Sequence, residues 1–266
     1  ITVDGLRTLL MMFFPDADRS GLQCRSAFAT LDYSYFIAAN AKRFGQTPLV
    51  RPCDDGSYRL TAEFSSMLGQ ATFRTFFTDT VEAGLFNALA LAESSRKHHI
   101  RQNHGFLYGE KYSVFDVMRL CGWPAEQVPQ NVGGYKLDTE TGSLPIFIKY
   151  EASQYGDRFL NPGEIEWFSK NNRSLKSNEF RWLLDGTERT PEWQNRHFVP
   201  IFIRRKAEEQ EKSYYFVGSA VALDDVRESV NRSEDGRESK VVVSTIKLIK
   251  PVDPELYRHL TGKSAL

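Results

Sequence analysis

The chain has 266 residues, with 34 basic and 34 acidic side chains and no formal net charge. Hydrophobic residues make up 41% and aromatic residues 13% of it, which is enough for a large core and excludes an unfolded chain. Because the total charge is zero, overall electrostatics favour no class of partner, and only the local distribution of charge is informative.

The cysteines and the apolar runs indicate the compartment. Cys24, Cys53 and Cys121 lie far apart without a CxxC spacing, which is typical of reduced thiols and predicts neither a disulfide framework nor a zinc site. The longest apolar runs, such as residues 6–14, are too short to span a bilayer, and no signal peptide is recognisable. We therefore expect a cytoplasmic protein with no membrane partner. The chain begins at Ile1, which indicates a piece of a longer polypeptide.

Residues 1–105 are predicted to form a helical domain. Apolar residues recur at three- and four-residue steps in 6–14, 27–41 and 62–92, and the breaker-rich segment 47–57 separates the last two runs. No catalytic spacing occurs in this half. His98, His99 and His104 have no suitably placed carboxylate, so we predict no metal site there.

Residues 106–266 have a different pattern. Ser113 and Asp116 form a capping box that opens a short helix, and a second helix is predicted over 255–260. Asn161, Pro162 and Glu164 predict a further short helix over 165–169. Charged residues 224–238 should form an exposed loop or hairpin. The expected strands are 134–137, 144–150, 198–204, 214–223 and 240–249. Together these elements predict an α+β fold, with N-terminal helices followed by a compact β-barrel with short helices.

The segment from Tyr155 to Ser177 combines aromatic, basic and small polar residues in a pattern that no fold requires. Its aromatic rings can stack on a flat base, and Asp157 can accept hydrogen bonds from an exocyclic amine. Residues 170–206 also carry nine Lys or Arg against four Asp or Glu, a candidate phosphate-binding patch. The alternative is structural: Phe159 and Trp167 belong to the core, and Asp157 pairs with Arg158 or Arg173.

Common enzymatic motifs are missing from the sequence. It has no GxxxxGK[ST], GxGxxG, GxSxG, HExxH or HxK pattern, so we predict no catalytic residue, no metal and no cofactor. A loose set of Asp138, Glu140 and Lys149 leaves a cryptic nuclease as one alternative.

Several motifs occur in a fixed order along the second half of the chain. They are Tyr108–Ser113, Gly134–Lys136, Pro145–Tyr150, Tyr155–Phe159, Trp167–Ser169, Ser174–Ser177 and Tyr215–Gly218. Over residues 106–260 this order resembles the C-terminal domain of unknown function that follows bacterial DEAD/DEAH-type helicases, often with a phospholipase-D-like nuclease. SauUSI-type ATP-dependent restriction enzymes, which cut DNA bearing modified cytosine, have this arrangement. Residues 1–100 resemble, less distinctively, the coupling region before that domain.

The resemblance implies a non-catalytic target-recognition module with an SRA-like or PUA-like barrel. Its partners would be double-stranded DNA with 5-methylcytosine or 5-hydroxymethylcytosine, and the helicase and nuclease domains of the same polypeptide. The flipped base would contact Tyr155, Asp157, Phe159 and Trp167. Phosphates would contact Arg158, Ser169, Lys170, Asn171, Arg173, Ser174, Lys176 and Ser177. A protein-interaction or coupling module and an RNA-binding PUA-like domain are the alternative functions.

Overall fold

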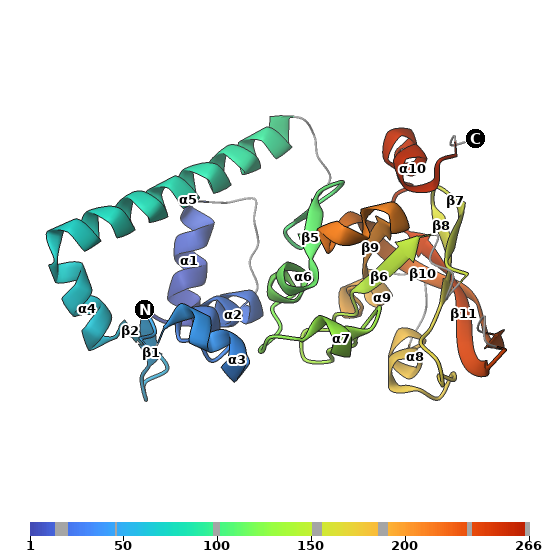
Figure 1. Cartoon of the computed structure of the whole chain (residues 1–266), viewed down its shortest axis with the longest axis horizontal. Helices are drawn as coiled ribbons and strands as arrows, with labels where there is room; N and C mark the ends of the chain where they lie inside the picture. The colour runs from blue at the N-terminus through green and yellow to red at the C-terminus, as the bar shows by residue number, and fades with distance from the viewer. Residues whose placement is uncertain are drawn as a thin grey trace. The chain divides into compact units, whose positions relative to one another are not determined.

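The computed structural model describes residues 1–13, 21–45, 47–97, 102–150, 156–185, 191–232 and 236–263 (Figure 1). The chain divides into two compact units. The first contains Ile1–Leu107 and Met118–Gln127, and the second contains Tyr108–Val117 and Val128–Leu266. The sequence predicted a division between residues 105 and 106, whereas this division places Phe106, Leu107 and Met118–Gln127 in the first unit.

The first unit consists mainly of helices, as predicted. They are α1 (Val3–Phe13), α2 (Gly21–Leu31), α3 (Ala38–Ala41), the 3-10 helix η1 (Lys42–Phe44), α4 (Ala62–Gly69) and α5 (Ala71–Lys97). Thr61 is the N-cap of α4, because its Oγ1 accepts a hydrogen bond from the amide of Phe64 (3.3 Å). No helix among the described residues is long and apolar enough to cross a membrane.

Two short strand pairs interrupt these helices. The antiparallel pair β1 (Val50–Pro52) and β2 (Tyr58–Leu60) lies in and directly after the breaker-rich segment 47–57. A second pair consists of β3 (Gln102–Asn103) and β4 (Phe106–Leu107). The first unit is therefore not purely helical.

The second unit is built on a seven-stranded sheet with the order β6-β9-β10-β11-β8-β7, in which β5 also pairs with β10. Its strands are β5 (Lys111–Ser113), β6 (Ile146–Tyr150), β7 (Arg158–Asn161), β8 (Glu164–Phe168), β9 (Pro200–Arg205), β10 (Ser213–Arg232) and β11 (Glu238–Leu248). Among the described strands of this sheet, β6 and β9 are the one parallel pair, and the other pairs are antiparallel. No pairing joins the edge strands β6 and β7 in the described part of the chain, so the sheet is half of a barrel. The predicted fold class is thus confirmed.

Strand β10 gives the sheet its curl. Its first part pairs with β5 and β9, and its later part pairs with β11. The register shifts around Val217 and Gly218, and Gly218 has a φ of 126°, which side chains with a Cβ rarely adopt. The predicted loop or hairpin at 224–238 is a hairpin, because Arg227–Arg232 of β10 pair with Glu238–Val243 of β11.

The helix predicted over residues 165–169 is wrong. Residues Glu164–Phe168 form β8, and Pro162 and Gly163 form the turn that joins it to β7. Oδ1 of Asn161 accepts a hydrogen bond from the amide of Gly163 (2.9 Å), so the signal taken for a helix start belongs to a hairpin turn. Burial alternates along β8 with the period of a strand.

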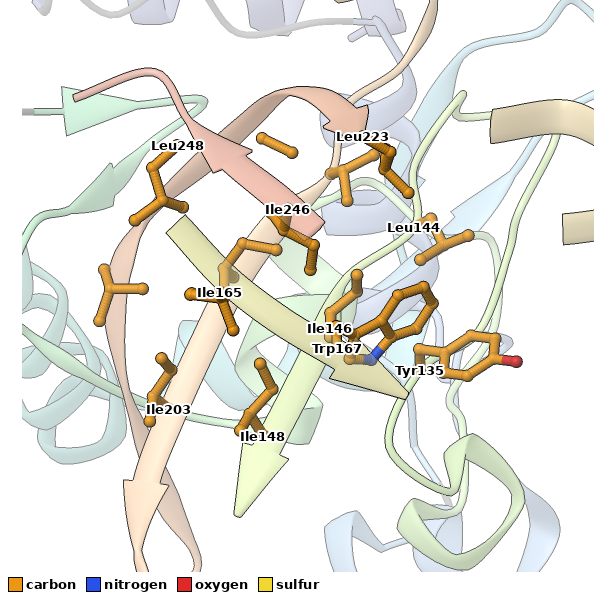
Figure 2. Packing of buried hydrophobic residues seen from close by; sticks show 14 of the residues in the cluster. Tyr135, Leu144, Ile146, Ile148, Ile165, Trp167, Ile203, Leu223, Ile246 and Leu248 are labelled. Atoms are coloured by element: carbon orange, nitrogen blue, oxygen red, sulfur yellow. The ribbon is translucent and has the colours of Figure 1, made fainter. Parts of the chain in front are cut away.

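The core of the second unit lies inside the curled sheet. Figure 2 shows isoleucines of β6, β8, β9 and β11 packed together with Trp167 and Tyr135. Short helices close this core: α8 (Asn178–Leu183), α9 (Pro191–Arg196) and α10 (Pro254–Thr261). Two further short helices, α6 (Val114–Leu120) and α7 (Pro129–Val132), lie earlier in the chain. The predicted capping box of α6 and the predicted C-terminal helix are both present.

Candidate functional site

A cavity of about 800 Å³ lies in the second unit, next to the edge strand β6. Its volume is in the range of small-ligand pockets. Segments that are far apart in sequence form its wall: the start of α6, the turn after α7, β6, and the end of β8. The aromatic side chains among the lining residues are Phe115, Tyr135, Phe147, Trp167, Phe168 and Tyr214.

Asp157 is the one carboxylate among the described residues that line this cavity. The amide of Phe168 donates a hydrogen bond to its Oδ1 (2.8 Å). Burial raises the pKa of the Asp157 carboxyl to about 7, and the charge of Glu166 adds to the effect. The group therefore changes its protonation state near neutral pH, which is uncommon for an aspartate and typical of functional sites.

The alternative pairing of Asp157 with a neighbouring arginine is not present. Arg158 pairs with Glu166 (2.9 Å), and Nε of Arg173 lies 2.7 Å from Glu179. Oδ2 of Asp157 has no hydrogen bond to any residue that the structure describes. The carboxyl group thus keeps acceptor capacity on the wall of the cavity.

Trp167 and Phe159, both predicted to contact a base, lie in different places. Trp167 is 2% exposed and packs against Tyr135 (ring centroids 5.0 Å apart), but it also lines the cavity. Phe159 lies between Tyr150 and Tyr257 in the core and does not line the cavity. The structural alternative therefore holds for Phe159, whereas Trp167 belongs to both the core and the cavity wall.

Tyr135 and Lys170 form one side of the cavity. Nζ of Lys170 lies 4.6 Å from the centre of the Tyr135 ring, a cation–π contact. Burial, together with the charge of Arg173, lowers the pKa of Lys170. The Tyr135 hydroxyl donates a hydrogen bond to Glu179 (3.0 Å), the same carboxylate that pairs with Arg173. Tyr135 and Lys170 also line a second, more open hollow of about 670 Å³.

Three of the predicted phosphate-binding residues are serines with internal hydrogen bonds. Ser169 is fully buried; its Oγ accepts from the amide of Val242 (2.8 Å) and donates to the carbonyl of Lys170 (3.0 Å). Oγ of Ser177 accepts from the amide of Ser174 (3.1 Å) in the turn before α8. Ser169 therefore joins β8 to β11, and its hydroxyl proton is already donated to a carbonyl. A phosphate contact would replace that hydrogen bond, and the assignment stays a prediction.

The remaining predicted phosphate contacts fall into two groups. Arg158 and Arg173 are ion-paired, as described above. Lys170, Asn171 and Lys176 form no ion pair or side-chain hydrogen bond with the described residues, and Asn171 and Lys176 are exposed. The last three are the ones that can contact an anion without breaking an existing pair.

Tyr155 lies outside the described residues, so its prediction has no structural counterpart. Two members of the loose nuclease set are engaged with other residues. Asp138 accepts hydrogen bonds from the amide (2.8 Å) and the hydroxyl (2.7 Å) of Thr141, and Lys149 bonds to Glu209 (3.1 Å). The described residues contain no cluster of His, Cys, Asp or Glu that could hold a metal ion.

The sequence did not assign Tyr135, Phe147, Phe168 or Lys212 to a site. Lys149 entered only the alternative nuclease set, and Arg204 only the basic stretch 170–206. A signal for part of this set was available, because five of the ordered motifs contribute lining residues. These residues are Ser113, Gly134, Tyr135, Phe147, Lys149, Asp157, Trp167, Phe168 and Ser169. The motifs thus meet at one cavity although they span 57 positions in sequence (113 to 169, inclusive).

Comparison with protein-family models assigns more than half of the chain to one family. Residues 106–260 match the model of a domain of unknown function, DUF3427, and residues 9–92 match a second one, DUF8090. No curated protein matches the chain.

Two solved structures are similar to the chain. The DNA recognition domain of the cytosine modification-dependent restriction endonuclease LpnPI matches at 12% identity and a TM-score of 0.38, covering 60% of this chain and 89% of that one. The sulfur binding domain and SRA domain of ScoMcrA, complexed with phosphorothioated DNA, matches at 12% identity and a TM-score of 0.33, covering 97% and 82%. At these TM-scores neither likeness supports an assignment of function.

Proposed function

We propose a function for this chain, which belongs to the DUF3427 family: it is the DNA target-recognition region of an ATP-dependent restriction helicase–nuclease of the SauUSI type. Its second unit binds double-stranded DNA that carries 5-methylcytosine or 5-hydroxymethylcytosine. The modified base leaves the duplex and occupies the cavity beside β6. The chain itself performs no catalysis.

The observation that carries this proposal is the Asp157 carboxyl group on the wall of an aromatic cavity. Cytosine presents an N4 amino donor next to the N3 acceptor. An ionised Asp157 accepts from N4, and a protonated one also donates to N3. A pKa near 7 makes both forms accessible at neutral pH.

The aromatic wall offsets the cost of removing the base from the duplex. Unstacking and unpairing cost a few kcal/mol, and each aromatic face that stacks on a base returns about 1–3 kcal/mol. Phe168 is only partly buried and lines the cavity, so its ring is available for stacking without loss of the core. Lys170, Asn171 and Lys176 then contact phosphates and position the duplex.

A binding assay tests this proposal directly. The chain is titrated with duplexes that contain 5-methylcytosine, 5-hydroxymethylcytosine or cytosine at one position, and with a structured RNA. We expect tighter binding to the modified duplexes, and a rise in fluorescence of a 2-aminopurine placed next to the modified base. Equal affinity for modified and unmodified duplexes contradicts the proposal, and preference for RNA favours the alternative of an RNA-binding domain.

Two variants assign the effect to the cavity. Asp157→Ala removes the carboxyl group and should abolish the preference for modified cytosine. Asp225→Asn is the control, because Asp225 is an exposed acid on the β10–β11 hairpin and its left-handed backbone (φ 49°) accommodates asparagine. Loss of preference in the control variant alone would move the recognition site away from the cavity.

A coupling role for the first unit is favoured by the exposed face of α5. Phe76 is 68% exposed and Phe86 is 71% exposed, and four more large apolar side chains of this helix, Val81, Leu85, Leu89 and Leu91, are also exposed. Surface of this kind marks protein contacts. Light scattering after gel filtration tests whether this face binds a second copy of the chain. The chain is compared with a Phe76→Ser/Phe86→Ser variant. A monomeric mass for both proteins argues against self-association.

A further inference from the structure

Lys149 and Arg204 are adjacent cations on neighbouring strands. They are register partners in the parallel pair β6–β9, and both line the cavity. Like charges placed side by side on a sheet destabilise it unless a negative charge compensates them. The sheet therefore places two positive charges side by side on the cavity wall.

The compensation among the described residues is incomplete. Glu209, in the 3-10 helix η2 (Lys206–Glu211), serves both cations with one oxygen. Its Oε1 lies 3.1 Å from Nζ of Lys149 and 3.7 Å from Nη2 of Arg204. One carboxylate thus faces two cations. The pair keeps an excess positive charge.

Arg204 is a buried cation whose environment orients its guanidinium group. It is 5% exposed, its guanidinium carbon lies 4.5 Å from the centre of the Tyr214 ring, and Nη1 donates to the carbonyl of Glu209 (3.2 Å). A buried charge is costly unless it is paired. A planar guanidinium held against an aromatic ring is the usual binder of phosphate oxygens.

Lys212 adds a third cation to the cavity wall. It lines the cavity, is exposed, and follows η2 in the left-handed backbone region with a φ of 57°. It forms no ion pair with a described residue. Across the whole cavity the described lining residues comprise four cations, the fourth being Lys170, and one carboxylate, Asp157.

We propose that Lys149, Arg204 and Lys212 form a phosphate subsite on the cavity wall, carried by β6, β9 and the residue after η2 rather than by β8. This inference rests on the proposed function and deepens it: the subsite holds the phosphodiester group next to the flipped nucleotide, while the base lies against Asp157 and Phe168. Lys149 and Lys212 lie outside both the predicted phosphate contacts in 158–177 and the basic stretch 170–206, whereas Arg204 belongs to that stretch. The subsite therefore anchors the flipped nucleotide itself, and the segment 170–176 contacts phosphates further along the backbone.

A double-mutant cycle with modified DNA tests the subsite. A neutral methylphosphonate replaces one phosphate, 5′ or 3′ of the 5-methylcytosine, and binding is measured for the chain and for Lys149→Met. Lys149 is 51% exposed, so this variant should fold normally. Lys263→Met, at an exposed position after α10, is the control.

We expect each single change to weaken binding about tenfold, which is typical of a charge-assisted hydrogen bond. The two changes together should cost little more than one of them, and the salt dependence should fall by about one log unit per log unit in Lys149→Met. Additive losses at both flanking phosphates would overturn the subsite. Equal binding of modified and unmodified DNA would instead overturn the proposed function.

A second measurement covers the case in which duplex binding is too weak for a cycle. Inorganic phosphate at constant ionic strength should raise the melting temperature of the chain, and should raise it less for Lys149→Met and Lys212→Ala than for Lys263→Met. An equal shift in all variants contradicts the subsite. Binding of free phosphate without any preference for duplex DNA would identify a small phosphate ester as the ligand and overturn the phosphodiester assignment.

Discussion

The amide nitrogen of Phe168 lies 2.8 Å from Oδ1 of Asp157, at the point where β8 ends and the cavity begins. This contact fixes one carboxyl oxygen and leaves the other on the cavity wall. Gly156 allows the close approach, because a Cβ at this position would lie 3.2 Å from the Phe168 ring. The chain thus places a titratable group and an aromatic ring together through two neighbouring segments.

The stability of the chain should depend on pH through Asp157. Its folded pKa of about 7 lies above the ordinary value of 3.8, so the folded state holds the proton more tightly than the unfolded state. Stability from this group is present below pH 4 and is lost as the pH rises to about 7, by at most about 1.4 kcal/mol per pH unit. Urea unfolding at pH 5 and pH 8 should show a difference about 1–3 kcal/mol larger for the native chain than for Asp157→Asn. The control Asp225→Asn should behave like the native chain.

Binding of modified DNA should weaken as the pH rises through 7. The protonated carboxyl offers cytosine both a donor and an acceptor, whereas the ionised form offers acceptors only. Loss of one hydrogen bond predicts a threefold to tenfold change, or about 1 kcal/mol. Asp157→Asn carries a permanent donor and acceptor, so its affinity should be retained and should not vary between pH 6 and pH 8. An asparagine variant as weak as Asp157→Ala would show that the charge, and not the hydrogen-bond pattern, is recognised.

Local sequence signals predicted the elements whose causes are local. The Ser113–Asp116 capping box forms with a 2.6 Å hydrogen bond between the two side chains, and Asp253 caps the predicted C-terminal helix. The failure at β8 is informative, because Asn161-Pro162-Gly163 fits a helix start and a hairpin turn equally well. The alternation of Glu and large apolar residues in Glu164–Phe168 was the signal that favoured a strand.

The cavity was predictable only in part, because long-range pairing assembles it. Asp157 and Trp167 are on one continuous segment, so the sequence grouped them, and both line the cavity. Tyr135 reaches the site through the pairing of Gly134 with β6, where the amide of Phe147 donates to the Gly134 carbonyl (2.6 Å). No local pattern encodes that contact. Phe159 looked equivalent to Trp167 in sequence, but its strand directs it toward Tyr150 and Tyr257.

Phe168 and Trp167 should respond differently to substitution. Trp167→Ala empties a core position and should cost about 3–5 kcal/mol of stability, which obscures any effect on binding. Phe168→Leu keeps an apolar side chain at a partly exposed position, so it should leave stability nearly unchanged and weaken binding to modified DNA, since a stacked ring contributes about 1–3 kcal/mol. Thermal unfolding and DNA titration of both variants check this. Unchanged affinity in Phe168→Leu would exclude its ring from the base site.

Ser169→Ala should act on stability rather than on DNA contacts. The substitution leaves the amide of Val242 without its side-chain acceptor inside the sheet, which should cost about 1–3 kcal/mol. Ser174→Ala, in a partly exposed turn, should cost less. Denaturant unfolding measures both. If Ser169→Ala keeps full stability and lowers DNA affinity, its hydroxyl contacts the ligand after all.

The salt dependence of DNA binding should separate paired from unpaired cations in the predicted phosphate-binding segment. Lys176 is exposed and has no ion pair with a described residue, so Lys176→Ala should reduce the slope of log affinity against log salt by about one, without changing the preference for modified cytosine. Arg173 already pairs with Glu179, which also accepts from the Tyr135 hydroxyl. Its charge is largely neutralised at 2.7 Å, so Arg173→Ala should change the slope by less than half as much.

Glu179→Gln is the informative partner variant, because it frees Arg173 and should steepen the slope. An unaltered slope in Glu179→Gln, together with a full loss in Arg173→Ala, would mean that Arg173 leaves its carboxylate when DNA binds.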